Sequence, residues 1–440
     1  MVYNEHDVDE SAMKTYQFSD LDDEQIRALC QRPKMDFMSV LEQIQPIIEE
    51  VSQQGDQAVL EYTEKFDGVR PAPLTINPQE TSPELDEETR SAIDTAFQNI
   101  YRFHKAQLAA PIEVETMPGI RCSRVARPIE KVGLYIPGGT AILPSTLMML
   151  GIPAMLAGCK QVVVATPPNA QGTVDDEMLY IAKKLEIKTL LLAGGAQAIA
   201  AMSYGTESVP KVDKIFGPGN QFVTAAKMWL QNSEAQVSID MPAGPSEVLV
   251  IADENANPAF VAADLLSQAE HGADSQVVIV ATPGFAFDEL QNELNNQLKQ
   301  LPRKEIAAKA LENSFSVQVE NIDDALYFSN RYAPEHLIVQ CDDADSLTDR
   351  IQHAGSVFLG PWSPESVGDY ASGTNHTLPT YGYARMYSGV SVDSFQKFIT
   401  MQRLDRAGLE SLAPSVAKLA DIEELEAHKR AVTIRLNDND

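Results

Sequence analysis

Short apolar runs alternate with helix-like stretches over much of this chain, and this alternation restricts the fold more than any other feature. Four runs of strand length follow one another at intervals of roughly 25 residues, and a second series of four comes after them. Strands joined by helices in this way form βαβ units, in which neighbouring strands run parallel. The pattern therefore predicts an α/β protein with two Rossmann-like parallel-sheet lobes. The first series comprises residues 132–137, 161–167, 189–195 and 212–217, and the second 247–253, 275–283, 336–340 and 355–360.

Helical patterns flank the two lobes. Apolar side chains recur at steps of three and four over residues 36–66, with Asp36 as a helix N-cap, and a charged helical pattern returns near the C-terminus. Only two of the 24 glycines precede residue 119, whereas twelve lie between 119 and 219, where strand-to-helix turns begin. We expect four parts. They are an N-terminal arm (1–29), a first α/β domain (30–134 with 246–385), a second α/β domain (135–245) and a C-terminal helical segment (386–440).

The charge and the cysteines restrict the possible partners and the compartment. The formal net charge is −29, which argues against nucleic acid or an anionic membrane as a partner. The first ten residues are acidic without a hydrophobic run, and prolines and glycines interrupt the uncharged stretch 132–159, so we expect neither a signal peptide nor a membrane span. The four cysteines form no C-x-x-C pair, which is typical of free thiols in a reducing cytoplasm.

Polar segments containing four of the seven histidines predict a metal site. Gln268 and His271 are three apart on a predicted helix that ends at Gly272, so both side chains share one face. Further polar segments supply carboxylate and imidazole groups. Nitrogen and oxygen donors in this mixture suit a divalent metal, and zinc suits them best. These segments contain Glu335 with His336, Asp369 with His376, and His428.

Three glycine turns follow strands of the first lobe, at residues 135–140, 192–198 and 216–222. None satisfies G-x-G-x-x-G, because Phe222 stands at the third glycine position of the last turn. Each turn alone is explained by the need for glycine between a strand and a helix. Three of them at the carboxyl edge of one sheet indicate a crevice for a phosphate or a ribose.

With these segments assembled, the chain resembles the histidinol dehydrogenase family over nearly its whole length, with the motifs in the family's order. The resemblance implies a zinc-dependent, NAD-linked enzyme that makes L-histidine from L-histidinol through histidinal by two successive oxidations, the last step of histidine biosynthesis. It also implies one zinc per subunit and a homodimer of intertwined subunits with a shared active site. The motifs are TEKFDGV (63–69), VGLYIPGGTAILPST (132–146), VDKIFGPGNQFVTAAK (212–227), MPAGPSEVLVIAD (241–253), LLSQAEHG (265–272), APEHL (333–337), GDYASGTNHTLPT (368–380) and LEAHKRAVTIRL (425–436).

The resemblance also implies a role for individual residues, matched by motif position. Glu335 and His336 correspond to the acid–base pair. The zinc ligands implied are Gln268, His271, Asp369 and His428, the last of them supplied by the partner subunit. The residues implied to hold histidinol are Ser246, His376 and Glu423, together with His336 and the four zinc ligands. The residues implied to line the NAD site are Tyr135, Gln197 and Asn220.

The chemistry of the implied reaction agrees with these residue types. Oxidation of an alcohol to an acid needs two hydride removals and one addition of water. His336 can accept the hydroxyl proton because an unperturbed imidazole has a pKa of about 6.5. We expect Glu335 to polarise the water that hydrates the aldehyde, and the two adjacent side chains to diverge toward different atoms. A cysteine thiohemiacetal is disfavoured because no cysteine lies in a recognisable catalytic segment.

Other interpretations of these motifs stay open. A zinc- and NAD-dependent dehydrogenase of another amino alcohol or polyol would use the same scaffold. If the chain were a non-catalytic zinc protein, Glu335 and His336 would have no role. If it were a zinc hydrolase, the glycine turns would have no role. Asp369 could serve only as a turn or cap residue, and His376 could support a ligand instead of touching the substrate.

Overall fold

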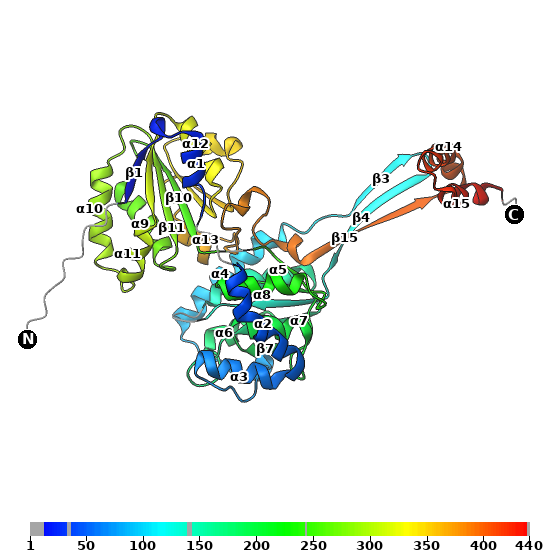
Figure 1. Ribbon diagram of the computed structural model, residues 1–440, viewed down its shortest axis with the longest axis horizontal. Coiled ribbons are helices and arrows are strands. Elements are labelled where there is room, and N and C mark those ends of the chain that lie inside the picture. The colour runs from blue at the N-terminus through cyan, green and yellow to red at the C-terminus, as the bar shows by residue number, and fades with distance from the viewer. Residues whose placement is uncertain (1–12, 33–36, 139–142, 243, 438–440) are drawn as a thin grey trace, which may run out of the picture.

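The computed structural model describes residues 13–32, 37–138, 143–242 and 244–437. Two α/β lobes lie side by side, and a long arm projects away from them (Figure 1). The predicted α/β class with two parallel-sheet lobes is confirmed, and each of the eight predicted runs contains a strand. Among the described residues, no helix is both long and apolar enough to cross a membrane.

One lobe, which we call lobe A and which contains the second predicted series of strands, has a six-stranded parallel sheet in the order β1-β12-β11-β10-β13-β14. Its central strands are buried on both faces and therefore read as continuous apolar runs. The helices α9, α10 and α11 cover one face, and α1 and α12 cover the other (Figure 1). The strands are β1 (Lys14–Gln17), β10 (Glu247–Ala252), β11 (Gln276–Ala281), β12 (Phe315–Gln318), β13 (His336–Gln340) and β14 (Ser356–Leu359). The helices are α1 (Asp23–Leu29), α9 (Pro258–Ala269), α10 (Phe287–Leu298), α11 (Lys304–Glu312), α12 (Ile322–Tyr332) and α13 (Glu365–Tyr370).

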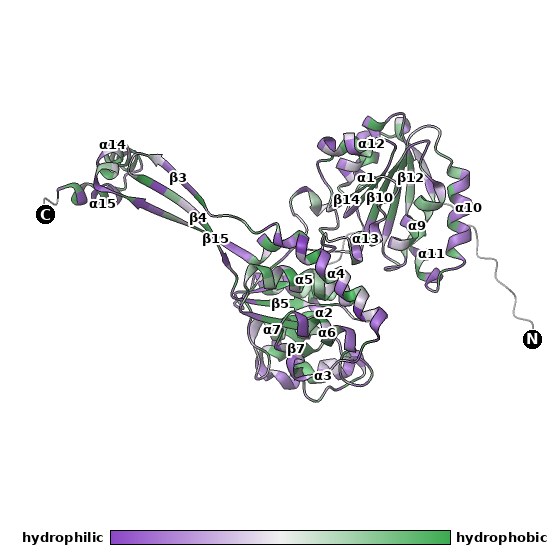
Figure 2. Cartoon of the chain, turned by 180° about the vertical axis from the view of Figure 1, so that it is seen from behind, coloured by the Kyte–Doolittle hydropathy of each residue, from purple (hydrophilic) through white to green (hydrophobic). Residues whose placement is uncertain are grey.

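Lobe B contains a second six-stranded sheet, in the order β2-β7-β6-β5-β8-β9, in which only the edge strand β2 runs antiparallel. Figure 2 shows its interior strands and helices as mainly hydrophobic. The strands are β2 (Thr75–Ile76), β5 (Lys131–Tyr135), β6 (Gln161–Thr166), β7 (Thr189–Leu192), β8 (Lys214–Phe216) and β9 (Ser238–Ile239). The helices are α2 (Phe37–Gln54), α3 (Asp56–Asp67), α4 (Glu87–Lys105), α5 (Pro144–Ala157), α6 (Asp176–Lys184), α7 (Gly195–Tyr204) and α8 (Gln221–Gln231).

The packing of the N-terminal helices differs from the expected domain boundaries. The apolar stripe of α2, which includes Ile44 and Ile48, packs with α7 and α8, and α4 packs on α5, so the helices α2 to α4 belong with lobe B. The first described residues were expected to form a separate arm, but β1 and α1 belong to lobe A. An amphipathic pattern reports that a helix has a buried face, and it does not report which sheet covers that face. The expected N-cap Asp36 lies outside the described residues.

The arm is a three-stranded antiparallel sheet with two helices at its tip (Figures 1 and 2). The C-terminal segment is therefore helical only in part, since one strand of this sheet comes from the residues predicted to form helix. The strands are β3 (Ile112–Met117), β4 (Ile120–Pro128) and β15 (Gln396–Leu404), and the helices are α14 (Arg406–Ile422) and α15 (Glu426–Asn437). Short 3-10 helices complete the described structure: η1 (Phe18–Asp20), η2 (Pro78–Glu80), η3 (Ala344–Arg350), η4 (Tyr383–Arg385) and η5 (Val392–Phe395).

Candidate active site

The predicted catalytic residues lie at the amino edge of the sheet of lobe A. His336 is the first residue of β13, and Glu247 is the first residue of the neighbouring strand β10, directly after Ser246. The helix α9 follows β10 and runs back across the sheet, so its last turn returns Gln268 to this same edge. The short helix α13 packs against α9 and brings Asp369 to the site. Residues from four separate segments therefore meet where two strands begin.

Asp369 lies at the centre of this group. One of its carboxylate oxygens is 3.5 Å from His336 Nε2, and the other is 3.9 Å from His271 Nε2. His336 and Asp369 are buried, whereas the side chain of His271 is 45% exposed at the opening. The structure therefore brings together Gln268, His271, His336 and Asp369, and leaves His271 accessible from solvent.

Glu365 is a member of the site that sequence reasoning missed. It is buried, it lies one helical turn before Asp369 on α13, and oxygen or nitrogen atoms of Glu365, His271 and Asp369 lie within 4.8 Å of one another. With the Gln268 amide oriented by its hydrogen bonds, Nε2 donates to the two Glu365 carboxylate oxygens at 2.9 and 2.5 Å. The spacing of Glu365 and Asp369 is a helical signal, but a six-residue helix gives too short a pattern to recognise.

Both catalytic candidates are held by the backbone of Glu247. The Glu247 N–H donates to Glu335 Oε2 at 2.9 Å, and the Glu247 carbonyl oxygen is 3.3 Å from His336 Nδ1. A carbonyl only accepts, so His336 Nδ1 carries a proton, and the buried Nε2 has no hydrogen-bond partner among the described residues. His336 Nδ1 is also 3.6 Å from Glu335 Oε2. Glu335 therefore lies on the Nδ1 side of the His336 ring, whereas Nε2 faces Asp369, and the expectation that the two side chains address different atoms stays a prediction.

The buried acids shift one another's titration. Burial raises the pKa of Glu335 and raises that of Glu365 well above its usual range. Burial alone would lower the pKa of His336, but the negative charges of Glu335 and Glu365 raise it well above its ordinary value. Burial also opposes ionisation of Asp369, yet its contacts with His336 and the neighbouring histidines hold its pKa below the usual range. Among the described residues, no lysine or arginine forms an ion pair with these three carboxylates.

His376 connects the site to lobe B. Its Nδ1 is 2.8 Å from the Asp369 carbonyl oxygen, and its Nε2 is 3.0 Å from the hydroxyl of Thr146 at the start of α5. The carbonyl requires a proton on Nδ1, so in the neutral ring Nε2 accepts from Thr146. The neighbouring Asn375 donates to the Met149 carbonyl at 2.6 Å, also on α5. The loop after Asp369 is thus fixed to the other lobe, and both nitrogens of His376 are engaged by protein atoms.

The three predicted cofactor residues lie at the carboxyl edge of the sheet of lobe B. Tyr135 ends β5, and its hydroxyl accepts the Gly195 N–H at 3.1 Å, where α7 begins after β7. Gln197 is buried in the first turn of α7, and its Oε1 has no hydrogen-bond partner in the described part of the chain. Asn220 caps α8 by accepting from two backbone N–H groups. Since the strand order reverses between β5 and β8, Tyr135 and Asn220 flank the switch point where α/β sheets bind ligands.

A buried ion pair supports the glycine turn beside Asn220, and sequence reasoning missed it. Lys227 pairs with Asp240, Lys227 Nζ donates to the Gly217 carbonyl at 2.9 Å, and the Gly217 N–H donates to Asp240 Oδ2 at 2.8 Å. Gly217 has φ +120°, and a Cβ there would lie 2.0 Å from the Tyr135 carbonyl oxygen. Only glycine fits this approach of two loops. Of the turn 135–140, Gly139 and Thr140 lie outside the described residues.

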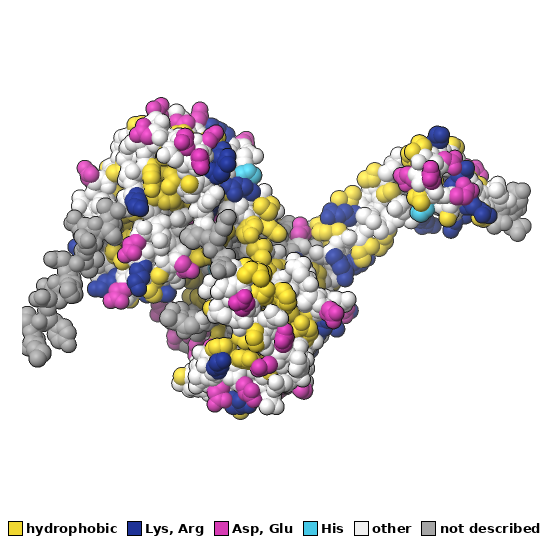
Figure 3. Space-filling model, viewed as in Figure 1, with side chains coloured by type: hydrophobic (Ala, Val, Ile, Leu, Met, Phe, Trp, Pro, Cys, Tyr) yellow, Lys and Arg dark blue, Asp and Glu magenta, His cyan; other side chains and the backbone are white. Residues whose placement is uncertain are grey.

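The remaining predicted residues, Glu423 and His428, lie far from this site in the same chain. Both are exposed at the tip of the arm (Figure 1). Hydrophobic side chains are also exposed along the arm, and Figure 3 shows them in yellow. They include Ile112, Val114, Ile399 and Met401 on the strands, and Leu419, Ile422, Leu425 and Ile434 on the tip.

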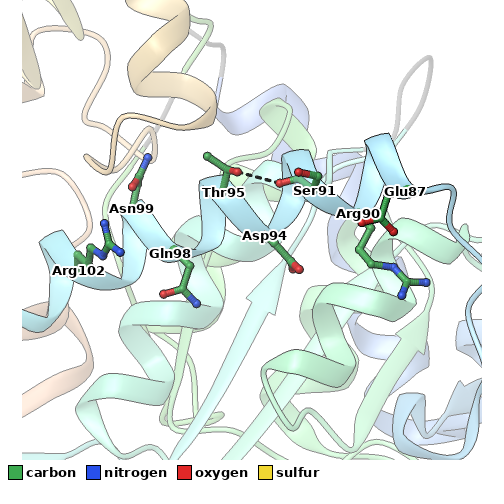
Figure 4. Close-up of a pocket in the computed structure, with 8 residues that line it drawn as sticks. All are labelled: Glu87, Arg90, Ser91, Asp94, Thr95, Gln98, Asn99 and Arg102. Carbon is green, nitrogen blue, oxygen red and sulfur yellow. Dashed lines mark hydrogen bonds between the residues drawn. The ribbon is translucent and has the colours of Figure 1, made fainter.

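A separate open hollow runs along α4, outside the predicted site (Figure 4). Its residues are charged or polar and come from one helix face, and Thr95 donates to the Ser91 carbonyl at 2.9 Å. It contains no histidine and no residue predicted for substrate, metal or cofactor. We therefore assign it no catalytic role. It is lined by Glu87, Arg90, Ser91, Asp94, Thr95, Gln98, Asn99 and Arg102.

Comparison with known proteins gives one consistent family. The family model described as histidinol dehydrogenase matches residues 30–436. The chain is 59% identical over 429 residues to the chloroplastic histidinol dehydrogenase of Arabidopsis thaliana, covering 97% of this chain and 92% of that protein. It is 53% identical to the histidine biosynthesis trifunctional protein of Neurospora crassa, covering 96% of this chain and 50% of that protein. A crystal structure of histidinol dehydrogenase from Elizabethkingia anophelis is similar, with a TM-score of 0.91 and 49% identity, covering 96% and 98% of the two chains.

Proposed function

Because the chain belongs to the histidinol dehydrogenase family, we propose that it oxidises L-histidinol to L-histidine through histidinal, the last step of histidine biosynthesis. In this proposal zinc is bound in the site and NAD is the oxidant in two successive hydride transfers. Family membership makes the chain an oxidoreductase. One observation is the main support for zinc-dependent oxidation of histidinol. Three distant segments of the chain bring Gln268, His271, His336 and Asp369 together at one edge of lobe A.

The donor set fits a divalent cation. Three buried carboxylates lie without a lysine or arginine partner among the described residues, which leaves negative charge uncompensated. Imidazole, amide and carboxylate donors together suit zinc, which Gln268, His271, Asp369 and His428 of the partner subunit would hold. Bound zinc supplies positive charge that orients the amine and imidazole of the substrate. A bound cation would offset the negative charge of the carboxylates that raises the pKa of His336.

The protein groups then perform the proton steps. His336 takes the substrate hydroxyl proton on Nε2, while its Nδ1–H stays bound to the Glu247 carbonyl. Glu335 polarises the water that adds to the aldehyde, and His336 accepts the proton of the second oxidation. Ser246 at the start of β10 and Glu423 of the partner subunit contact histidinol. We assign His376 to holding the Asp369 loop, because both of its nitrogens are engaged by Asp369 and Thr146.

Lobe B holds NAD in this proposal. Tyr135 and Asn220 flank the switch point, and the unpartnered Oε1 of buried Gln197 offers an acceptor at the same edge. NAD held by these residues would supply the hydride acceptor for each oxidation. Gly217 lets the two loops approach closely enough to form the floor of this site.

A homodimer with shared sites completes the proposal. The site in one chain lacks His428 and Glu423, whereas the arm carries both of them far away among exposed apolar side chains. An exposed apolar surface of this kind is typical of a protein interface. The arm of one subunit would therefore reach the lobe A site of its partner. We propose the cytoplasm as the compartment, although the Arabidopsis relative is chloroplastic.

The test is the yield of NADH from limiting L-histidinol, with and without a chelator, together with identification of the product. We expect about two NADH per histidinol, with histidine as product. Activity should be lost on chelation and return with zinc. The second candidate is a zinc- and NAD-dependent dehydrogenase of another amino alcohol or a polyol. Failure of the zinc-loaded protein to oxidise histidinol, with turnover of another alcohol in a panel, would favour that candidate.

A further inference from the structure

Glu365 is a buried carboxylate that the packing of lobe A does not require. Its side chain is 1% exposed, and no lysine or arginine of the described residues pairs with it. Burial of an acid without a lysine or arginine partner is unfavourable, and an apolar side chain of similar volume would be more stable there. Its polar contact is the Gln268 amide, whose Nε2 lies 2.9 and 2.5 Å from its two oxygens.

This contact decides which atom of Gln268 faces the metal. An amide carries an oxygen, which can bind a cation, and an NH₂ group, which cannot. Rotation of the terminal side-chain torsion by half a turn exchanges the oxygen and the NH₂ group, and this rotation costs little energy. Because a carboxylate only accepts hydrogen bonds, Glu365 favours the orientation in which the NH₂ group points at α13. The amide oxygen then points away from Glu365.

We propose that Glu365 is a positioning residue that holds the Gln268 amide with its oxygen directed to the metal. The inference rests on the proposed zinc site. A direct ligand role is the competing explanation, because a Glu365 oxygen lies within 4.8 Å of ligand atoms of His271 and Asp369. The geometry favours positioning, because the Gln268 amide engages both Glu365 oxygens.

The test measures zinc affinity, not activity. Full-length protein is freed of metal and titrated with zinc against a chromophoric chelator, for the wild type, Glu365→Gln, Gln268→Ala and the double variant. We expect Glu365→Gln to weaken zinc binding about 10- to 100-fold, as is usual for groups that orient a ligand. The double variant should bind zinc as Gln268→Ala does, because Glu365 acts through Gln268.

The double-mutant cycle separates the two roles. Additive losses would show that Glu365 binds zinc independently and would overturn the proposal. Unchanged affinity in Glu365→Gln, with tight binding by the wild type, would also overturn it while leaving the proposed function intact. No zinc binding by the wild type itself would reject the zinc site first, and the inference with it.

Two further variants control for charge and folding. Glu270→Gln removes the same charge at the end of α9, at a residue without a side-chain hydrogen bond among the described residues, and should stay within a few-fold of wild-type affinity. Metal-free Glu365→Gln should unfold at or above the wild-type temperature, because the amide has a similar volume and avoids the cost of burying an ionisable acid. If that variant does not fold, Glu365→Asp keeps the charge and shortens the reach to Gln268. It should then show the same affinity loss, and wild-type affinity in Glu365→Asp would contradict the proposal.

Discussion

Glu335 and His336 share a strand end, and the backbone of Glu247 holds both of them. The N–H of Glu247 binds the Glu335 carboxylate, and its carbonyl accepts from His336 Nδ1, so both catalytic candidates are anchored at the start of β10. Glu247 is itself fixed by Arg32, whose guanidinium makes two hydrogen bonds of 2.7 and 3.0 Å to its carboxylate. Bidentate pairs of this kind give geometric precision as well as energy. The position of the acid–base pair therefore depends on residues that take no part in the chemistry.

Replacing Glu335 by Gln should separate the two oxidations. The amide keeps the volume and can still receive the Glu247 N–H, but it polarises water poorly, so aldehyde oxidation should slow by about 10² or more while alcohol oxidation is spared. The check is the rate of NADH formation from histidinol and from histidinal in separate experiments. His336→Gln is the matched control, and it should lose both reactions. Equal losses in both reactions of Glu335→Gln would contradict the assignment.

Asp264 makes the stability of lobe A depend on pH. It is buried on α9, and burial raises its pKa to about 6, although a 2.7 Å hydrogen bond from Gln340 opposes that shift. Between about pH 4 and pH 6 the folded state keeps a proton that the unfolded state has released, so stability falls as pH rises through this window. Above pH 6 the ionised group destabilises the fold by up to about 3 kcal/mol.

Asp264→Asn should remove this dependence. The asparagine keeps an oxygen for Gln340 and cannot ionise, so the variant should be more stable than the wild type at pH 7.5 and no more stable at pH 4. Urea unfolding of the metal-free protein at both pH values, at one protein concentration, measures the difference. An equal change at pH 4 and at pH 7.5 would show that ionisation of Asp264 is not the cause.

At the scale of elements, the two proposed sites lie at opposite edges of their sheets. The proposed NAD site of lobe B lies at the carboxyl edge, where β5 and β8 end beside Tyr135 and Asn220. The proposed metal site of lobe A lies at the amino edge, where β10 and β13 begin and where α9 returns. Glycine turns follow strands and therefore indicate a carboxyl edge in the sequence. No comparable sequence motif indicates an amino edge, because the side chains at that edge come from strand starts and helix ends that are far apart in the chain.

Gly217→Ala should weaken NAD binding without affecting the metal site. The new Cβ would meet the Tyr135 carbonyl oxygen at 2.0 Å, in a backbone conformation that favours glycine. Relief of that contact separates the β5 and β8 loops, so the KM for NAD should rise roughly tenfold or more. Gly68→Ala is the control, since Gly68 also has a positive φ but open space around it. Zinc content should stay at the wild-type level in both, and an unchanged KM in Gly217→Ala would contradict this role.

Some elements could be predicted from the sequence and others could not. The eight predicted strands of the two sheets are apolar on both faces, so their pattern is independent of what packs on them. β4 and β15 were missed because they form an arm whose residues are mostly exposed or half-buried, which leaves no apolar run. α13 was missed because six residues give less than two turns of periodicity, and Glu365 was missed with it.

At the scale of the whole molecule, one chain does not complete the proposed site. The lobes supply Gln268, His271 and Asp369, while His428 stays at the tip of the arm. Truncation before residue 420 should therefore strip zinc and activity while leaving most of the α/β core folded. Zinc analysis and circular dichroism of the truncated protein check this. One tightly bound zinc per truncated chain would reject His428 as a ligand.

A mixture of two inactive variants tests the sharing of sites between subunits. His336→Asn damages the lobe and His428→Asn damages the arm, so each homodimer should be inactive. Unfolding and refolding the two together should give mixed dimers in which one site has an intact lobe and an intact arm. We expect about a quarter of wild-type activity from random pairing. No recovery, with mixed dimers present by mass spectrometry, would show that each site is built within one chain.

The sequence by itself determined eight strands of the two sheets, the family, and the residue types that we propose for the chemistry. Each of these depends on side chains that are neighbours in the chain, where periodicity and motif order are visible. Only the tertiary structure decided that α2 to α4 cover lobe B, that the site uses the amino edge of lobe A, that Glu365 contacts Gln268, and that the arm stands apart. These features depend on the packing of segments that lie up to several hundred residues apart, and a local pattern shows that a face is buried without showing what buries it.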